Sequence, residues 1–233
     1  MKKIIIIPTY NEKKNITKLI NKIFKLYKSD FDVLVVDDNS PDKTLNEVIK
    51  LKKKYKFLKY LKRNKKLGIG SAHKAAILNS YKKKYDLIIT MDSDGTHDPI
   101  YIKKMTNKIK KYDLIITNRF KKKNSLSEWP IHRIFLTKLR FYLISFLLNI
   151  PLDTSGAYRC YNTKKINIKD ILIAKDNGYS FFWESGYVLF KKKYKIFEIP
   201  IKLPYRTVGS SKMKISDIIR ALYYLSIVAI KRL

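Results

Sequence analysis

Residues 87–95 read LIITMDSDG, an uncharged apolar run that ends in two carboxylates and a glycine. A short continuous run of branched apolar residues is typical of a strand that is buried on both faces. Gly95 supplies a turn directly after Asp92 and Asp94, which brings their carboxylates together. The segment therefore predicts a buried strand whose carboxyl end presents oxygen ligands.

The same pattern recurs along the first half of the chain. Further strands are predicted at residues 4–7, 33–36, 57–61 and 113–117. The first two are continuous apolar runs, which end at Pro8 and at Asp37 and Asp38. Helical patterns lie between them, at residues 11–27, 42–54 and 70–81 and after Pro99. Alternating strands and helices predict an α/β fold with a mostly parallel, doubly wound sheet. Ligands bind such sheets beyond the carboxyl ends of the strands.

The composition describes a strongly basic globular protein. The 233 residues include 51 Lys and Arg against 19 Asp and Glu, a formal net charge of +32, and 45% are hydrophobic, which excludes wholesale disorder. The single Cys160 excludes an intrachain disulfide and a thiolate zinc site. This charge favours polyanionic partners, namely nucleic acid, an anionic lipid surface or a phosphorylated substrate. Lysine bias accounts for most of the charge, so the eight Arg stand out as candidates for two-pronged phosphate binding.

Two apolar helical patterns occupy the second half, at residues 131–150 and 215–233. Their uncharged runs, residues 141–152 and 221–230, are shorter than the roughly 20 residues that a membrane-spanning helix needs. We expect a catalytic unit over residues 1–212, followed by an amphipathic helix over residues 213–233. That helix either packs on the catalytic unit or lies on a membrane surface, and the sequence leaves both alternatives open.

The acidic cluster after residue 91 suits a hard divalent cation. Mg²⁺ and Mn²⁺ prefer carboxylates together with substrate phosphates, so Asp92 and Asp94 predict a site for a metal ion and a diphosphate. A solvated turn is the alternative interpretation.

Several motifs in order resemble the family-2 glycosyltransferases of GT-A fold, whose nucleotide-sugar domain is Rossmann-like. The first three follow predicted strands: residues 8–12 (PTYNE), 35–40 (VVDDNS) and 91–94 (MDSD). The others are residues 117–120 (TNRF), Trp129-Pro130 with Arg133, residues 153–159 (DTSGAYR), 178–181 (GYSF), and Arg206 with residues 209–212 (GSSK). Together they resemble the dolichyl-phosphate (polyprenyl-phosphate) mannose synthases over nearly the whole chain.

This resemblance implies a role for each matching residue. Nucleotide-sugar binding is implied for Pro8, Tyr10, Glu12, Asp37, Asp38, Asp92 and Ser93. Metal binding is implied for Asp92 and Asp94 with Thr96, which stands where the family commonly has Gln. Catalytic or phosphate-binding roles are implied for Asp94, Arg119, Arg133, Arg206 and Lys212. We expect His97 to be a hydrogen-bonded spacer, with a catalytic base as the alternative. For Arg206 the alternative is a solvated loop charge, and Arg159 is expected either to bind phosphate or to pair with Asp153.

The resemblance implies an inverting, Mg²⁺- or Mn²⁺-dependent transfer of a hexose to the phosphate of dolichyl or polyprenyl phosphate. GDP-mannose is the expected donor, and UDP-glucose or another nucleotide sugar is the alternative. We expect a peripheral protein on the cytoplasmic face of an anionic membrane, with a membrane-anchoring partner subunit left open and no nucleic acid as partner. Transfer to a soluble or polysaccharide acceptor, a basic nucleic-acid-binding module and an inactive membrane scaffold are the rival hypotheses.

Overall fold

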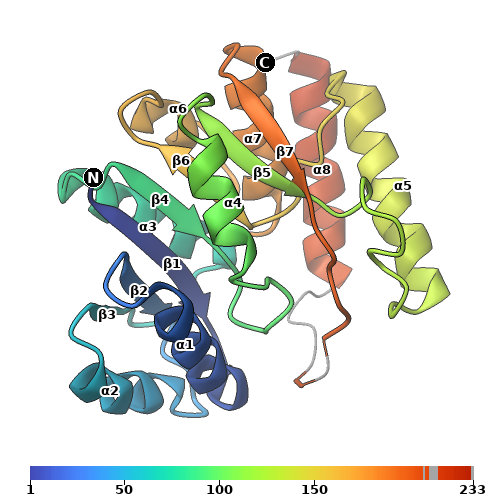
Figure 1. Ribbon diagram of the computed structural model, residues 1–233. Helices are drawn as coiled ribbons and strands as arrows, with labels where there is room; N and C mark the ends of the chain where they lie inside the picture. The colour runs from blue at the N-terminus through green and yellow to red at the C-terminus, as the bar shows by residue number, and fades with distance from the viewer. Residues whose placement is uncertain (207, 210–214, 232–233) are drawn as a thin grey trace.

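The computed structural model describes residues 1–206, 208–209 and 215–231. Its centre is a seven-stranded sheet with the order β3-β2-β1-β4-β6-β5-β7 (Figure 1). The strands are β1 Lys3–Thr9, β2 Asp32–Asp37, β3 Leu58–Lys62, β4 Leu87–Thr90, β5 Leu114–Asn118, β6 Arg159–Asn162 and β7 Ile196–Pro200. β6 runs antiparallel to β4 and β5, whereas the other described pairings are parallel. The mostly parallel α/β fold predicted from the sequence is confirmed.

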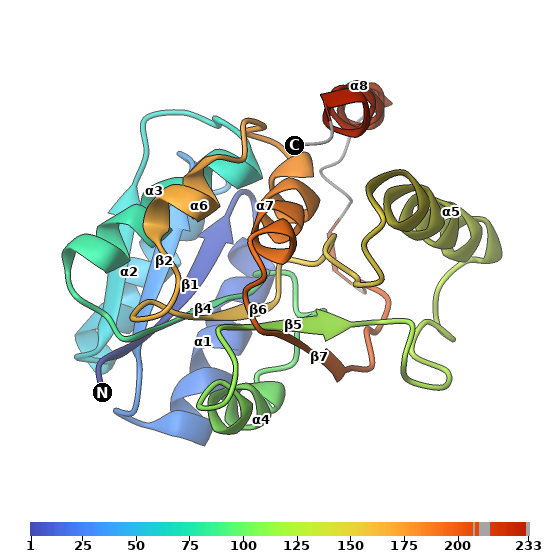
Figure 2. The same cartoon turned by 90° about the horizontal axis from the view of Figure 1, so that it is seen from above.

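Helices cover both faces of this sheet (Figure 2). One face carries α1 Lys13–Tyr27, α2 Thr44–Lys54 and α4 Tyr101–Lys108, and the other carries α3 Ile69–Lys82, α6 Ile168–Leu172 and α7 Ser180–Lys191. Two further helices, α5 Ile131–Leu148 and α8 Ile215–Lys231, lie to one side of these layers (Figure 2).

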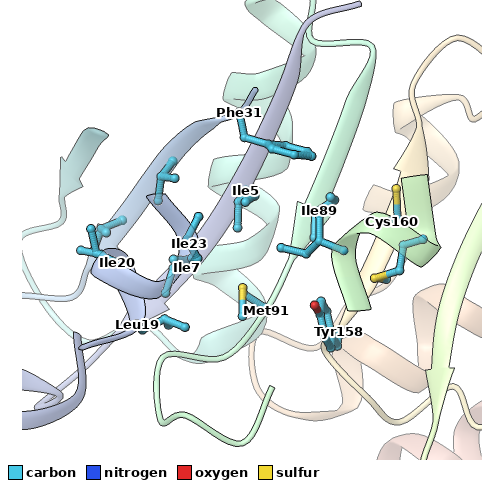
Figure 3. Packing of buried hydrophobic residues seen from close by; sticks show 14 of the residues in the cluster. Ile5, Ile7, Leu19, Ile20, Ile23, Phe31, Ile89, Met91, Tyr158 and Cys160 are labelled. Atoms are coloured by element: carbon cyan, nitrogen blue, oxygen red, sulfur yellow. The ribbon is translucent and has the colours of Figure 1, made fainter. Parts of the chain in front are cut away.

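The isoleucines of β1 show why the sheet is covered twice. Successive side chains of a strand point to opposite faces. Ile5 and Ile7 accordingly pack against α1 (Figure 3), whereas Ile4 and Ile6 pack against α3. Burying one such side chain contributes about 1.5–3 kcal/mol to folding, so an uninterrupted isoleucine run is stable only between two helical layers.

The first strand is longer than the sequence predicts. We expected it to stop at Pro8, yet β1 continues to Thr9. The Met91 N–H donates to the Ile6 carbonyl at 3.1 Å, so Ile6 faces β4, and Pro8, two residues on, faces the same way. β4 ends at Thr90, opposite Ile6, so no residue of β4 lies opposite Pro8. Proline is therefore tolerated at this position, because its missing N–H costs no hydrogen bond between strands.

The two lateral helices are each buried along one side only. α5 contributes Ile144 and Leu148, and α8 contributes Leu225 and Val228, to a cluster on α7. Their outer sides expose large apolar side chains, including Ile131, Phe135, Tyr142, Phe146, Ile215, Ile219 and Tyr223. Within the described residues no helix combines the length and the apolar character that crossing a bilayer requires. The expected boundary between residues 212 and 213 lies outside the described ranges.

Candidate active site

Asp92 and Asp94 lie in the loop directly after β4, at the edge of the sheet where β1 and β2 also end (Figure 1). The predicted turn is present, with Gly95 at a φ of +82°. One carboxylate oxygen of Asp94 accepts hydrogen bonds from the Thr96 hydroxyl at 2.7 Å and from its N–H at 3.1 Å. The turn therefore fixes one oxygen of Asp94, and Thr96 lies where it contacts that carboxylate.

His97 supports the backbone of this loop. The Asp92 N–H donates to His97 Nδ1 at 2.9 Å, and the imidazole stacks on Tyr158 with ring centroids 5.0 Å apart. Nδ1 is therefore the acceptor of this contact, and the ring holds the backbone of the loop at Asp92. The contact agrees with the expected spacer role.

The electrostatics of this loop suit a divalent cation. Burial raises the pKa of Asp92 and the like charge of Asp94 adds to the effect, whereas His97, Arg206 and Arg119 oppose it. In the described part of the chain no group of three or more His, Cys, Asp or Glu side chains is arranged to hold a metal. Mg²⁺ binds through one or two carboxylates plus substrate phosphates, so two aspartates at a strand end fit it.

Arg206 joins two remote parts of the chain at this edge. Its Nη2 pairs with Glu12 Oε1 at the start of α1, and its Nε lies 3.7 Å from Asp94 Oδ2. Glu12 is held on its other oxygen by Asn15 Nδ2 at 2.7 Å. Because Arg206 contacts two carboxylates and is largely buried, it is not a solvated loop charge.

The end of β2 forms a rigid polar corner. Asp37 is 1% exposed and accepts hydrogen bonds from Thr9 Oγ1 at 3.1 Å and from Ser40 Oγ at 2.6 Å. Asp38 Oδ1 lies 3.0 Å from Arg63 Nε, and burial raises the pKa of Asp38 while Arg63 opposes the rise. Pro8, Tyr10 and Ser93 belong to the neighbouring strand ends, and their expected contacts with a nucleotide stay a prediction.

The remaining predicted basic residues lie around α5. Arg119 Nε binds Asp153 Oδ2 at 2.8 Å. The Arg133 guanidinium lies 4.8 Å from the ring centre of Trp129 and 5.4 Å from that of Tyr205, the residue before Arg206. Glu12, Asp94, Thr96 and Arg206 are thus joined by direct contacts, while Arg119 and Arg133 are each held by other partners. Lys212 lies outside the residues that the structure describes.

Both expectations for Arg159 are wrong. Its side chain is fully buried within β6 and donates to five acceptors: the carbonyls of Thr154, Gly156 and Phe182 and the hydroxyls of Tyr161 and Ser185. Asp153 binds Arg119 instead. A guanidinium that is saturated with protein acceptors is a structural group of the sheet, not a phosphate ligand.

Three residues near the site were not predicted from the sequence. Arg63 pairs with Asp38, and Arg140 of α5 donates to Ser155 Oγ at 3.2 Å. Tyr179 has its pKa raised to about 12 by burial and by the charges of Asp92 and of Asp217, which lies in the first turn of α8. Rarity of arginine was the available signal for Arg63 and Arg140, whereas Tyr179 lies in the motif at residues 178–181, to which no role was assigned.

A mostly parallel sheet with one reversed strand, and with paired aspartates after a central strand, defines a GT-A-like glycosyltransferase fold. The chain belongs to glycosyl transferase family 2, whose pattern matches residues 4–172. The glucosyl-3-phosphoglycerate synthase of Mycobacterium tuberculosis, solved with Mn²⁺ and UDP, has a TM-score of 0.63. At 16% identity, over 99% of this chain and 79% of that one, it is similar in fold.

Relatives of closer sequence act on lipid phosphates according to their names. The polyprenol monophosphomannose synthase of Mycolicibacterium smegmatis is 28% identical over 224 residues, which cover 94% of this chain and 84% of that protein. The dolichol-phosphate mannosyltransferase of Pyrococcus furiosus is 29% identical over 232 residues, and the match covers 97% of this chain but 64% of that longer protein. The undecaprenyl-phosphate mannosyltransferase of Micrococcus luteus is 28% identical over 91% of this chain and 88% of its own length.

Proposed function

We propose that this chain transfers mannose from GDP-mannose to the phosphate of a polyprenyl phosphate such as dolichyl phosphate. The names of the three relatives support both the sugar and the lipid acceptor. The observation that carries the proposal is the contact of Arg206 with Glu12 and Asp94, because it gathers a guanidinium and the acidic strand end at one place.

Transfer of the sugar to a phosphate requires neutralisation of the phosphate charges more than it requires a general base. A phosphate monoester has a second pKa of about 6 and is largely dianionic at neutral pH, so it can attack the sugar without giving up a proton. One of its oxygens forms a bond to the anomeric carbon. The bond from that carbon to the diphosphate breaks with its electron pair, and the configuration of the carbon inverts.

Arginines at the site would oppose the repulsion between the two phosphate groups. Arg206 faces Asp94, and Arg119 lowers the pKa of Asp92, which supports a position for both guanidinium groups beside the acidic loop. Mg²⁺ or Mn²⁺, held by Asp92 and Asp94 with Thr96 beside them, would neutralise the diphosphate leaving group. Fixed charges aimed at the leaving group stabilise the transition state without reorganisation.

The acceptor also explains the exposed apolar faces of α5 and α8. A polyprenyl phosphate keeps its phosphate at the surface of a bilayer, where exposed apolar side chains of α5 and α8 would contact the lipid. Ile131 and Phe146 of α5 are 85% and 84% exposed, and Ile219 of α8 is 64% exposed. Apolar helices beside basic residues bind anionic membranes, which supports a peripheral position on the cytoplasmic face.

A panel of donors tests this proposal. Radiolabelled GDP-mannose, UDP-glucose and UDP-N-acetylglucosamine are each incubated with the protein, polyprenyl phosphate and Mn²⁺, and label is counted in the organic extract. We expect GDP-mannose to give the highest kcat/KM. Transfer from UDP-glucose alone would support the alternative donor. No transfer to lipid from any donor, with transfer to a soluble acceptor instead, would contradict the proposal.

A further inference from the structure

Arg140 is a half-buried cation on α5 to which the proposed reaction assigns no role. It lies seven residues after Arg133, two helical turns along the same side of α5, with Thr137 between them. Its Nη2 donates to Ser155 Oγ at 3.2 Å, and its Nε is buried without a hydrogen-bond partner. A buried guanidinium nitrogen without an acceptor is costly, so it marks a place where an acceptor is missing from the protein itself.

The surrounding charges leave Arg140 without a counterion. Ser155 Oγ also accepts from Arg119 Nη2 at 3.3 Å and donates to Asp153 Oδ1 at 2.8 Å. Asp153 pairs with Arg119 through its other oxygen. Two guanidinium groups therefore share one serine hydroxyl and a single carboxylate.

The next carboxylate of this network is already neutralised. Glu198 accepts from Asn118 Nδ2 and from the Asp153 N–H, and its second oxygen lies 2.5 Å from Lys121 Nζ. Burial and the charge of Arg119 lower the pKa of Arg140 to about 10, which agrees with an uncompensated positive charge. The cluster of Arg119, Arg140, Asp153 and Ser155 thus carries an excess charge that an anion would balance.

We propose that Arg140, together with Arg119 and Ser155, binds the phosphate monoester of the lipid acceptor. This inference rests on the proposed function and adds to it a residue that recognises the acceptor. Ser155 and Gly156 are partly exposed, so the cluster is open to a ligand. A guanidinium pair matches a phosphate dianion both in charge and in its planar donor geometry.

The neighbourhood of Arg140 favours the acceptor over the donor. Leu143 lies three residues further along α5 and borders an apolar hollow of about 570 Å³, which Tyr142 and Phe146 also line. A prenyl chain that leaves a phosphate at Arg140 meets this apolar surface directly. The donor side of the site, by contrast, is marked by Asp94 and Arg206 at the ends of other elements.

The test compares Arg140→Met with Lys138→Met, which removes an equal charge from an exposed position two residues away on α5. Binding of farnesyl phosphate, farnesol and inorganic phosphate is measured by calorimetry on the full-length protein at constant ionic strength. We expect Arg140→Met to weaken farnesyl phosphate binding about 10- to 100-fold, the loss of charged hydrogen bonds, and Lys138→Met to change it less than about 2-fold. The KM for polyprenyl phosphate should rise with it, while the KM for GDP-mannose stays unchanged.

Several results would overturn the inference. The first is that Arg140→Met binds farnesyl phosphate with the wild-type affinity. The second is that the wild-type protein binds inorganic phosphate as tightly as it binds farnesyl phosphate. If Arg140→Met fails to fold, Arg140→Lys takes its place, and unchanged binding by that variant also refutes the two-pronged contact. Wild-type protein that binds farnesyl phosphate through Arg140 but transfers no sugar would refute the proposed function and leave the phosphate site standing.

Discussion

Individual arginines explain how the acidic strand ends coexist with a charge of +32. Three arginines around the site each pair with a carboxylate: Arg63 with Asp38, Arg119 with Asp153, and Arg206 with Glu12. Arginine offers five donors in a rigid plane, whereas lysine is a strongly hydrated point charge that remains at the surface. In a lysine-rich chain, arginine therefore marks positions where hydrogen bonds of a defined direction are needed.

Asp94→Asn tests the metal-binding role of the acidic loop by replacing one carboxylate oxygen with an amide group. The amide oxygen still accepts from the N–H and the hydroxyl of Thr96, so the turn at Gly95 is retained. The variant loses a charge that a divalent cation needs, and we expect transfer to fall about 100-fold or more. The thermal unfolding temperature should stay within about 2 °C of wild type. Wild-type transfer rates in this variant would refute a metal-binding role for Asp94.

His73 gives a pH dependence that is independent of catalysis. It is fully buried on α3 with both ring nitrogens unpartnered, and burial, followed by the charges of Arg159 and His97, lowers its pKa to about 3. Between the unfolded pKa of about 6.5 and this value, the unfolded chain binds a proton that the folded protein does not. The free energy of unfolding therefore falls as the pH falls through this window.

The measurement is urea unfolding at pH 7 and pH 5 for wild type and His73→Leu. We expect the wild type to lose about 2 kcal/mol more than the variant between these pH values, because leucine has no proton to bind. Equal losses would mean that His73 is protonated or solvated in the folded protein.

The elements differ in how well the sequence predicts them. Parallel strands with uninterrupted apolar runs were located because each is buried on both faces, and the acids that follow them were placed at the ligand-binding edge. β6 was missed because its four residues include the charged Arg159 and show no apolar run. Arg159 is stable there because acceptors from α7 and from the preceding loop surround it, and those contacts are invisible in a linear sequence.

The lateral helices were predicted, but their packing was not. The spacing of apolar residues predicted that α8 is an amphipathic helix. It left open whether this helix packs on the catalytic unit or lies on a membrane. The structure buries Leu225 and Val228 against α5 and α7 and exposes Ile219 and Tyr223. One side of the helix thus packs on the protein while its other side remains available to a partner or a lipid surface.

Phe146→Ser tests whether the exposed apolar side of α5 contacts a membrane. The side chain is 84% exposed, so its loss should change the free energy of unfolding by less than about 0.5 kcal/mol. We expect binding to vesicles of phosphatidylcholine and phosphatidylglycerol, measured by co-sedimentation, to weaken about 10-fold as the membrane contact of a large apolar side chain is lost. The control is Phe57→Ser, which removes an exposed aromatic ring directly before β3. Equal effects of the two variants would refute a membrane role for α5.

On the scale of the whole molecule, the fold combines an acidic strand edge, a group of arginines and two apolar helices. Figure 1 shows α5 and α8 beside the sheet, each beginning toward the end of the molecule where β1 ends. A lipid held along these helices would bring its phosphate toward the arginines, and a nucleotide sugar would approach the same edge at β1, β2 and β4. The large positive charge then favours both an anionic membrane and anionic substrates.

The most direct test follows labelled mannose from GDP-mannose in one assay with three acceptors: polyprenyl phosphate, polyprenol and no lipid. Each reaction is run with Mn²⁺ and with excess EDTA. We expect a mannose-labelled lipid only with polyprenyl phosphate and Mn²⁺, with the activity lost in EDTA and restored by added metal. Labelled lipid formed equally from polyprenol, or undiminished in EDTA, would contradict this expectation.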